Sequence, residues 1–190
     1  MSKKKGIMVI DDHPAVRAGM LRFINATDDL RVCSEAADHD SALAMLKKIC
    51  PDAVLLDISL GDKNRSGLDL ISHIHLMAKN APVLVVSMHS KTLFAERSRL
   101  AGAAGYLTKQ ESAETICDAL RVVLEGGVYF CAPLSTQQPA DATGLLPLDS
   151  LGNREFEVFR LVGEGLSSRS IAKAMVLSVK TVDNHIIMPP

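Results

Sequence analysis

The feature that most constrains the fold is a set of short, uninterrupted apolar runs. They are "GIMVI" at 6–10, "DAVLL" at 52–56 and "PVLVV" at 82–86, and their lack of polar alternation is typical of parallel strands covered on both faces. Two further segments, "LRVCSEA" and "GYLTK", read as weaker, edge-like strands. Stretches with apolar residues at helical spacing separate the strands. Five repeats of strand and helix predict an α/β fold with an open, doubly wound, five-stranded parallel sheet, whose ligand site lies at the carboxyl ends of the strands.

The composition indicates an ordinary globular chain. With 190 residues, 47% hydrophobic and 23% charged, it suits one domain plus a small second one. A net charge of −1 creates no field that would recruit nucleic acid, so such binding needs a local patch. No run of about eighteen apolar residues occurs, which predicts a soluble, cytoplasmic protein with no membrane partner. The four cysteines lack zinc-site spacing, which favours reduced thiols over disulfides or zinc.

Polar side chains stand where the predicted strands end. Asp57 follows the third strand, Asp11 and Asp12 follow the first, Ser87 ends the fourth and Lys109 ends the fifth. Three crowded carboxylates repel one another, which raises their pKa values or requires a cation, and their hard oxygen atoms suit Mg²⁺. A carboxylate can also attack a phosphoryl group and form an aspartyl phosphate, while a metal and a lysine neutralise charge on the transferring oxygens. For Asp57 taken alone, the alternative is an aspartate that simply opens the following loop.

The order of four motifs resembles the receiver domain of two-component response regulators. They are "VIDDHPAVRAGM", "VLLDISL", "VVSMHS" and "AGAAGYLTK". The resemblance implies a flavodoxin-like sheet, a sensor histidine kinase as partner, and Asp57 as the phosphoacceptor. It also implies that Lys109 pairs with the phosphoryl group, that Ser87 closes on it, and that Tyr106 is an aromatic switch. The implied Mg²⁺ ligands are Asp11, Asp12, Asp57 and the backbone carbonyl of Ser59. The chain would catalyse only phosphoryl transfer to its own aspartate and loss from it, and would not otherwise be an enzyme.

Two other functions of such a sheet fit the sequence less well. A flavin-binding module would cradle a phosphate in the first loop, where Asp11 and Asp12 would repel it. A haloacid-dehalogenase-type phosphatase resembles D-x-D at its nucleophile, whereas Ser59 stands two positions after Asp57. One departure from the receiver pattern is the loop between Asp57 and Gly67, which is longer than is typical by two residues and more polar.

A second domain is expected after a linker. The predicted division is a receiver at 1–127, a linker at 128–147 that is rich in Gly, Pro, Ser, Thr and Ala, and a helical domain at 148–190. Helices are expected at about 154–163, 169–175 and 179–187, the second capped by Ser167 or Ser168 and the third by Ser178. Two short helices joined by a tight turn are typical of a helix-turn-helix. The side chains expected to point inward are Val158, Leu161, Val162, Val179, Val182 and Ile186.

The third helix of this domain carries the candidate DNA contacts. Its outward residues, which offer partners to phosphates and base edges, are Lys180, Thr181, Asn184 and His185. Through "REFEVFRLVGEGLSSRSIA" and "LSVKTVDNH", residues 148–185 resemble the LuxR-type DNA-binding domain that follows receivers in the NarL/FixJ group. That resemblance implies a transcriptional regulator whose third helix enters the major groove. A small helical docking domain is the alternative that the spacing leaves open.

The end of the chain departs from that family. The family's recognition helix continues with further basic residues, and a fourth helix closes the domain, whereas this chain reads "IIMPP" after His185. Residues 148–190 also hold equal numbers of basic and acidic residues. The helix-turn-helix domain is therefore interpreted as incomplete, and DNA binding by the chain as written is expected to be weak or absent.

The sequence thus predicts a response regulator that accepts a phosphoryl group on an aspartate from a histidine kinase and regulates transcription. Formation of a homodimer on phosphorylation is a further option. The alternative function is a phosphorylation-controlled protein-interaction module that does not bind DNA.

Overall fold

The computed structural model describes residues 3–60, 67–78, 81–88, 91–130, 153–175 and 177–187. The chain forms two compact units, Met1–Leu134 and Ser135–Pro190. Most of the predicted linker lies outside the described residues. Within the part of the chain that is described, no helix has both the length and the apolar character needed to cross a membrane.

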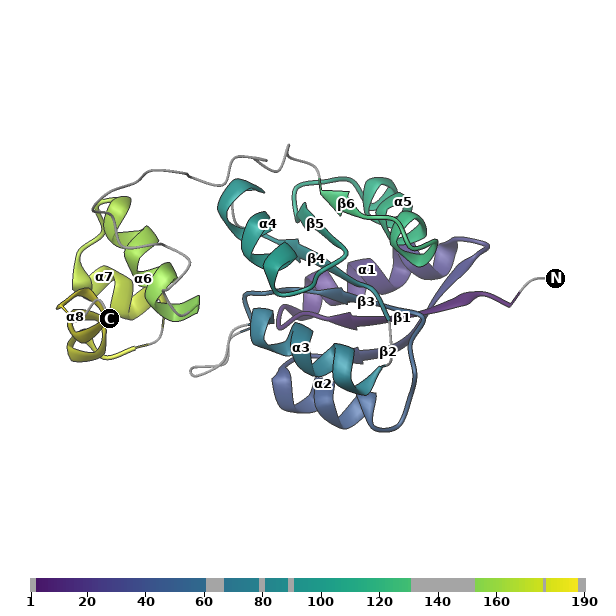
Figure 1. The fold of residues 1–190 in the computed structure, drawn as a ribbon, viewed down its shortest axis with the longest axis horizontal. Coiled ribbons are helices and arrows are strands. Elements are labelled where there is room, and N and C mark those ends of the chain that lie inside the picture. The colour runs from purple at the N-terminus through teal and green to yellow at the C-terminus, as the bar shows by residue number, and fades with distance from the viewer. Residues whose placement is uncertain are drawn as a thin grey trace. The chain divides into compact units, whose positions relative to one another are not determined.

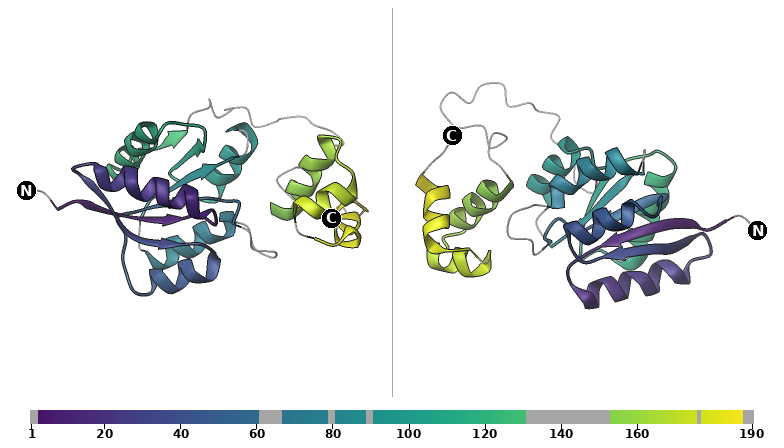
Figure 2. Two further views of the ribbon diagram at one scale, coloured as in Figure 1. Left: turned by 180° about the vertical axis from the view of Figure 1, so that it is seen from behind. Right: turned by 90° about the horizontal axis from the view of Figure 1, so that it is seen from below.

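The first unit is a parallel sheet with helices on both faces (Figures 1 and 2). Across the sheet the strands run β2 (Leu30–Ala36), β1 (Lys5–Ile10), β3 (Ala53–Leu56), β4 (Val83–Ser87), β5 (Gly105–Thr108) and β6 (Tyr129–Phe130). All neighbouring pairs are parallel. The helices are α1 (Pro14–Ala26), α2 (His39–Leu46), α3 (Gly67–Met77), α4 (Lys91–Leu100) and α5 (Ala113–Leu124). The predicted doubly wound α/β class is confirmed.

Alternation along the strands divides the core between the two faces of the sheet. On β1, Ile7 and Val9 pack in a cluster with Ile24 of α1 and Leu120 of α5. Met8, between them in the sequence, is also fully buried and points to the opposite face, which α2 and α3 cover (Figure 2). Both faces of the strand are therefore apolar, which explains the runs without alternation.

The structure has a sixth strand where the sequence predicts five. β6 lies in the segment assigned to the linker, and Tyr129 pairs with Gly105 of β5. A Cβ atom at position 105 would lie 2.6 Å from the carbonyl oxygen of Tyr129, so β6 can approach this closely because position 105 is glycine. The expectation that "GYLTK" forms an edge strand is therefore wrong, and all four residues of β5 are buried. A two-residue strand is too short for periodicity to reveal.

Within its described residues, the second unit contains three short helices, α6 (Asn153–Gly163), α7 (Ser168–Ala174) and α8 (Val179–Ile187), whose bounds lie within one residue of those expected. Ser167 accepts a hydrogen bond from the N–H of Ser170 at 3.2 Å, and Ser178 accepts one from the N–H of Thr181 at 3.0 Å. These contacts satisfy N–H groups that the helix itself leaves unpaired. The expected small helix-turn-helix unit is confirmed.

Three of the six side chains expected inside this unit are exposed. Val158, Leu161 and Val182 are buried, but Val162, Val179 and Ile186 are 40%, 41% and 43% exposed. At about 100° per residue, Val179 and Ile186 are rotated from Val182 by roughly 60° and 40° in the same direction. They therefore lie on one flank of α8, beyond the narrow strip that contacts α6 and α7, so of the three apolar residues expected on one face of α8 only Val182 packs inward.

Candidate functional site

The carboxyl ends of four strands bring the predicted crevice residues together. Asp11 follows β1 and Asp57 follows β3, and the N–H of Asp57 donates to the carbonyl oxygen of Ile10 at 2.8 Å. Ser87 ends β4, and its carbonyl oxygen accepts a hydrogen bond from the N–H of Lys109, just after β5, at 2.8 Å. The parallel register therefore aligns these residues along one edge of the sheet.

Lys109 lies between two of the carboxylates. Its Nζ atom is 2.6 Å from Oδ2 of Asp57 and 2.7 Å from Oδ2 of Asp11. All three side chains are buried: Lys109 is 6% exposed, Asp57 1% and Asp11 7%. Buried charges are tolerated when each is paired and hydrogen-bonded, so one lysine allows two acids to be buried side by side.

The pKa values of Asp57 and Lys109 are both raised, for different reasons. Burial raises the pKa of Asp57, although Lys109 and the N–H of Ser59 both favour its charged form. Burial alone would lower the pKa of Lys109, but hydrogen bonds with Asp11 and Asp57 outweigh it and raise that pKa. Lys109 is thus a fixed cation at neutral pH, and the carboxylate of Asp57 is poorly solvated. Such a carboxylate is stabilised by any cation or covalent bond that neutralises its charge.

A group of side chains next to Lys109 could hold a metal ion. Its members are Asp11, Asp12, His13 and Asp57, and one ligand atom from each lies within 4.8 Å of the others. One lysine opposes three carboxylates, which leaves a formal charge of roughly −2 on these groups. The backbone of Ser59 lies beside them, because its N–H donates to Oδ1 of Asp57 at 2.9 Å. Oxygen donors with excess negative charge fit a divalent cation.

Ser87 and Tyr106 form a buried hydroxyl pair next to the acids. Their exposed fractions are 0% and 1%, and the two side chains are hydrogen-bonded. Burial raises the pKa of Tyr106 to about 12, and the nearby charge of Asp57 acts in the same direction. Tyr106 therefore occupies an inward position, against the hydroxyl that is predicted to close on a phosphoryl group.

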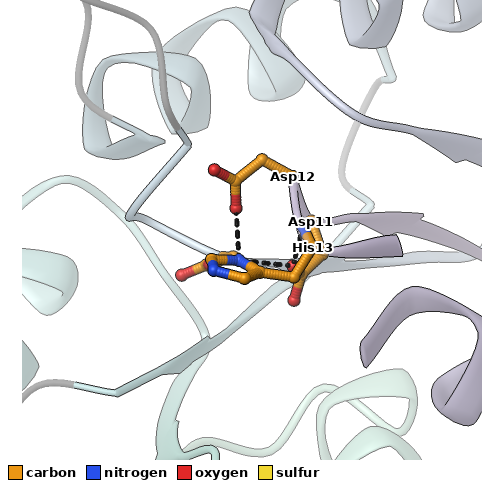
Figure 3. A group of neighbouring side chains, drawn as sticks. Asp11, Asp12 and His13 are labelled. Carbon is orange, nitrogen blue, oxygen red and sulfur yellow. Dashed lines mark hydrogen bonds and ion pairs between the residues drawn. The ribbon is translucent and has the colours of Figure 1, made fainter. Parts of the chain in front are cut away.

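His13 also belongs to the acidic group, a position that was not predicted from the sequence. Its N–H donates to Oδ1 of Asp11 at 2.8 Å, and its Nδ1 lies 2.6 Å from Oδ1 of Asp12 (Figure 3). Its sequence position could have indicated this, because His13 stands between the two acids and Pro14. Proline restricts the residue before it to extended conformations. His13 has φ −89° and ψ 108°.

Arg17 supports the same loop from α1. Its guanidinium donates to the carbonyl oxygen of Asp11 at 2.7 Å and to the Glu35 carboxylate at 2.9 Å. Arg17 is only 18% exposed, and it ties the end of β1 to β2. The sequence does not reveal this contact, because Glu35 reaches Arg17 only through the pairing of β1 with β2.

The loop after Asp57 returns to the site at Gly67. The N–H of Gly67 donates to the carbonyl oxygen of Ile58 at 3.1 Å. A Cβ atom at Gly67 would lie 2.4 Å from Cα of Ile58 and 2.7 Å from the carbonyl oxygen of Asp57, so the position requires glycine. Residues 61–66, which make up most of the unusually long loop, lie outside the described residues.

The four candidate DNA contacts lie on α8. Lys180 and Asn184 are exposed, and Thr181 and His185 are partly exposed. The hydroxyl of Thr181 lies 2.7 Å from that of Ser178, so it also takes part in capping the helix. Of the four candidates, Lys180 and Asn184 are therefore the more exposed.

Comparisons with known proteins assign both units to families. Residues 7–121 match the response regulator receiver domain, and residues 149–187 match the luxR family of bacterial regulatory proteins. The chain is 31% identical over 188 residues to the transcriptional activator protein ExaE of Pseudomonas putida, covering 96% of this chain and 87% of ExaE. It is 29% identical over 199 residues to the transcriptional regulatory protein DegU of Brevibacillus brevis, covering 95% and 84%. A LuxR-family two-component response regulator from Aurantimonas has a similar structure, with a TM-score of 0.62 and 32% identity, covering 67% of this chain and 89% of that chain.

The fold, the acidic group and the helix-turn-helix define a receiver followed by a LuxR-type DNA-binding unit. The chain belongs to the two-component response regulators of the NarL/FixJ family, which are homologous to transcriptional regulators rather than to conventional enzymes.

Proposed function

We propose that this chain accepts a phosphoryl group on Asp57 from a sensor histidine kinase and thereby changes how its second unit regulates transcription. The observation that carries the proposal is the contact of buried Asp57 with Lys109 at 2.6 Å. A carboxylate oxygen of Asp57 attacks the phosphorus atom, and the bond to the donor histidine breaks with its electrons passing to nitrogen. Lys109, held on its other side by Asp11 at 2.7 Å, neutralises charge on the transferring oxygens.

Mg²⁺ is the proposed cofactor of this transfer. Its proposed ligands are Asp11, Asp12, Asp57 and the backbone carbonyl of Ser59. Bound there, the ion supplies positive charge to the phosphoryl oxygens. The excess negative charge of the group supports this assignment. The hydrogen bonds from His13 and Arg17 also support it, because they fix both the carboxylate and the backbone of Asp11.

Ser87 and Tyr106 are proposed to convert phosphorylation into a change of shape. A phosphoryl group on Asp57 offers acceptor oxygens to the hydroxyl of Ser87, in competition with its bond to Tyr106. A contact made in one state and absent in the other is what shifts a population between states. The complete burial of this pair supports the proposal, since neither hydroxyl can turn to water instead.

DNA is the proposed partner of the second unit, with Lys180, Thr181, Asn184 and His185 as contacts. The description of ExaE as a transcriptional activator and of DegU as a transcriptional regulatory protein supports this. Lys180 is the only Lys or Arg of α8, so a single copy should bind weakly at physiological salt. A homodimer formed on phosphorylation would double the contacts. The proposed location is the cytoplasm, where the chain would meet both kinase and DNA.

Phosphorylation by a small acyl phosphate tests the proposal. Intact-mass analysis after incubation with acetyl phosphate and Mg²⁺ should show one phosphoryl adduct, which chelation of the metal prevents. Asp57→Asn should abolish the adduct. The matched control is Asp118→Asn, at an aspartate on α5 whose side chain is 68% exposed, and it should leave the adduct unchanged. An adduct that persists in Asp57→Asn would overturn the assignment.

A further inference from the structure

We propose that His13 is a nitrogen ligand of the acidic site, which therefore binds divalent transition-metal ions such as Mn²⁺ and Co²⁺ more tightly than Mg²⁺. The inference rests on the proposed function for the metal-binding role of the carboxylates. It adds a ligand and a metal preference to that site.

The distances within the group suit a shared ion. Nδ1 of His13 lies 2.6 Å from Oδ1 of Asp12 and 3.5 Å from Oδ1 of Asp11 (Figure 3). An ion bound at ~2.1 Å by two ligands at right angles holds those ligand atoms roughly 3 Å apart. The observed separations fall on either side of that value. An ion could thus enter between the imidazole and the two carboxylates with only small movements of the side chains.

The backbone places His13 beside the acids. His13 precedes the first residue of α1, Pro14, which restricts it to the extended conformation that it shows. Its N–H donates to Oδ1 of Asp11 at 2.8 Å, which turns the loop back on the first acid. Asp57 reaches the same group from β3. Donors from β1, β3 and the start of α1 therefore converge, and none depends on the second unit.

The donor types determine which ions the site prefers. Carboxylate and carbonyl oxygens suit Mg²⁺ and Mn²⁺ alike, whereas imidazole nitrogen favours the later first-row ions. Mg²⁺ holds its waters tightly and is rarely bound through nitrogen. Adding His13 to three carboxylates should therefore raise the affinity for Mn²⁺ and, more strongly, for Co²⁺. The His13 side chain is 61% exposed, so an exchanging ion can reach it directly from solvent.

Binding measurements on the full chain test this preference. Calorimetric titration with Mg²⁺, Mn²⁺ and Co²⁺ should give tighter binding of both transition ions by the wild type. Removing a group that hydrogen-bonds to a metal ligand typically weakens metal binding by about 10–100-fold. Loss of a direct ligand in His13→Gln should therefore weaken Co²⁺ binding by at least about tenfold, and Mn²⁺ binding by less. Mg²⁺ binding should change little. His73→Gln, at an exposed histidine of α3, controls for adventitious binding and should behave as the wild type.

Pulsed electron paramagnetic resonance gives a readout that does not depend on affinity. Bound Mn²⁺ should show coupling to a ligated nitrogen in the wild type and in His73→Gln, and not in His13→Gln. Replacing histidine nitrogen by ¹⁵N in the unsubstituted chain should change that coupling. The inference would be overturned if bound Mn²⁺ showed oxygen ligands only. It would also be overturned if His13→Gln weakened the binding of Mg²⁺, Mn²⁺ and Co²⁺ equally. Acetyl phosphate labelling of the wild type in Mg²⁺ is scored separately, so failure of the proposed function is distinguishable.

Discussion

The position of Lys109 between two buried carboxylates makes Lys109→Met a direct test of what stabilises the crevice. Methionine keeps the length of the apolar stem and removes the charge that lies 2.6 Å from Asp57 and 2.7 Å from Asp11. Removing one partner of a buried ion pair typically destabilises a protein by ~3–5 kcal/mol, because it leaves an uncompensated buried charge. Here two carboxylates lose their partner, so we expect a loss of about 3–5 kcal/mol in the free energy of unfolding, against ~5–15 kcal/mol for a typical domain.

The pH dependence of this variant follows from the pKa of Asp57. Burial already raises that pKa, and Lys109 opposes the shift, so removing Lys109 should raise it further. An acid whose folded-state pKa lies above its unfolded value of 3.8 destabilises the fold above that raised pKa. This destabilisation decreases as the pH falls through the raised pKa and is absent below the unfolded value. Lys109→Met should therefore approach the stability of the wild type on acidification.

Urea unfolding measures the change in the free energy of unfolding. Far-ultraviolet circular dichroism is the probe, because the chain contains no tryptophan whose fluorescence could be followed. The titrations are made with a metal chelator present. Adding Asp57→Asn to Lys109→Met removes one of the two unpaired buried charges. The double variant should therefore regain part of the free energy of unfolding that Lys109→Met loses. The control is Lys5→Met, whose ion pair with Asp52 is at least 42% exposed on both sides and should contribute about 1 kcal/mol or less. A loss in Lys109→Met no larger than in Lys5→Met, or no rescue by Asp57→Asn, would refute the reasoning.

Four other predictions concern separate parts of the chain. Gly67→Ala should destabilise the receiver unit by about 1–3 kcal/mol and slow acetyl phosphate labelling, because its Cβ would meet the backbone of the loop after the third strand; urea unfolding and intact mass report the two effects. Ser87→Ala should still be phosphorylated but lose the change in hydrogen exchange of β5, and an unchanged response would contradict its coupling role. A hydrogen bond with Arg121 lowers the pKa of Asp29 from 3.8 to about 2, so the ionised Asp29 contributes to the stability of the fold. This contribution is fully present above pH 3.8 and is lost as the pH falls through about 2. Because the pair is largely exposed, Asp29→Asn should lose only about 0.5–1 kcal/mol near neutral pH, and progressively less as the pH falls from 3.8 through about 2, in chemical denaturation. Lys180→Ala should reduce the slope of log affinity against log salt by about one unit in DNA titrations, equally for all sequences.

The sequence by itself determined the class of fold and the layout of the crevice. Short continuous apolar runs that alternate with helical stretches are typical of strands covered on both faces, and such strands are usually parallel. Once the strands are parallel, residues that directly follow them must lie along the same edge of the sheet. That is why Asp11, Asp57 and Lys109 could be expected together, although 52 residues separate the last two. Helix starts were equally accessible, because a cap such as Ser167 or Ser178 acts on an N–H only three residues away.

Other features depend on contacts that no local pattern records. Whether β5 is an edge strand depended on whether a two-residue segment at Tyr129 paired with it, and that depended on the room beside Gly105. The side chains that pack inside the second unit depended on how three helices cross, which left Val179 and Ile186 on an uncovered flank. Periodicity gives the apolar side of a helix but not the width of the strip that its neighbours cover.

Only the tertiary structure showed which atoms of the crevice meet. A sequence can place a lysine and three acids at one edge, but their hydrogen bonds depend on strand register and side-chain rotamers. Lys109 bridges Asp57 and Asp11 because both neighbouring strand ends present an oxygen atom to the same Nζ atom. His13 joins the acids because Pro14 and the hydrogen bond from its backbone N–H to Asp11 hold its backbone beside them. The residue types of the site are local information, whereas their pairing is a property of the packed fold.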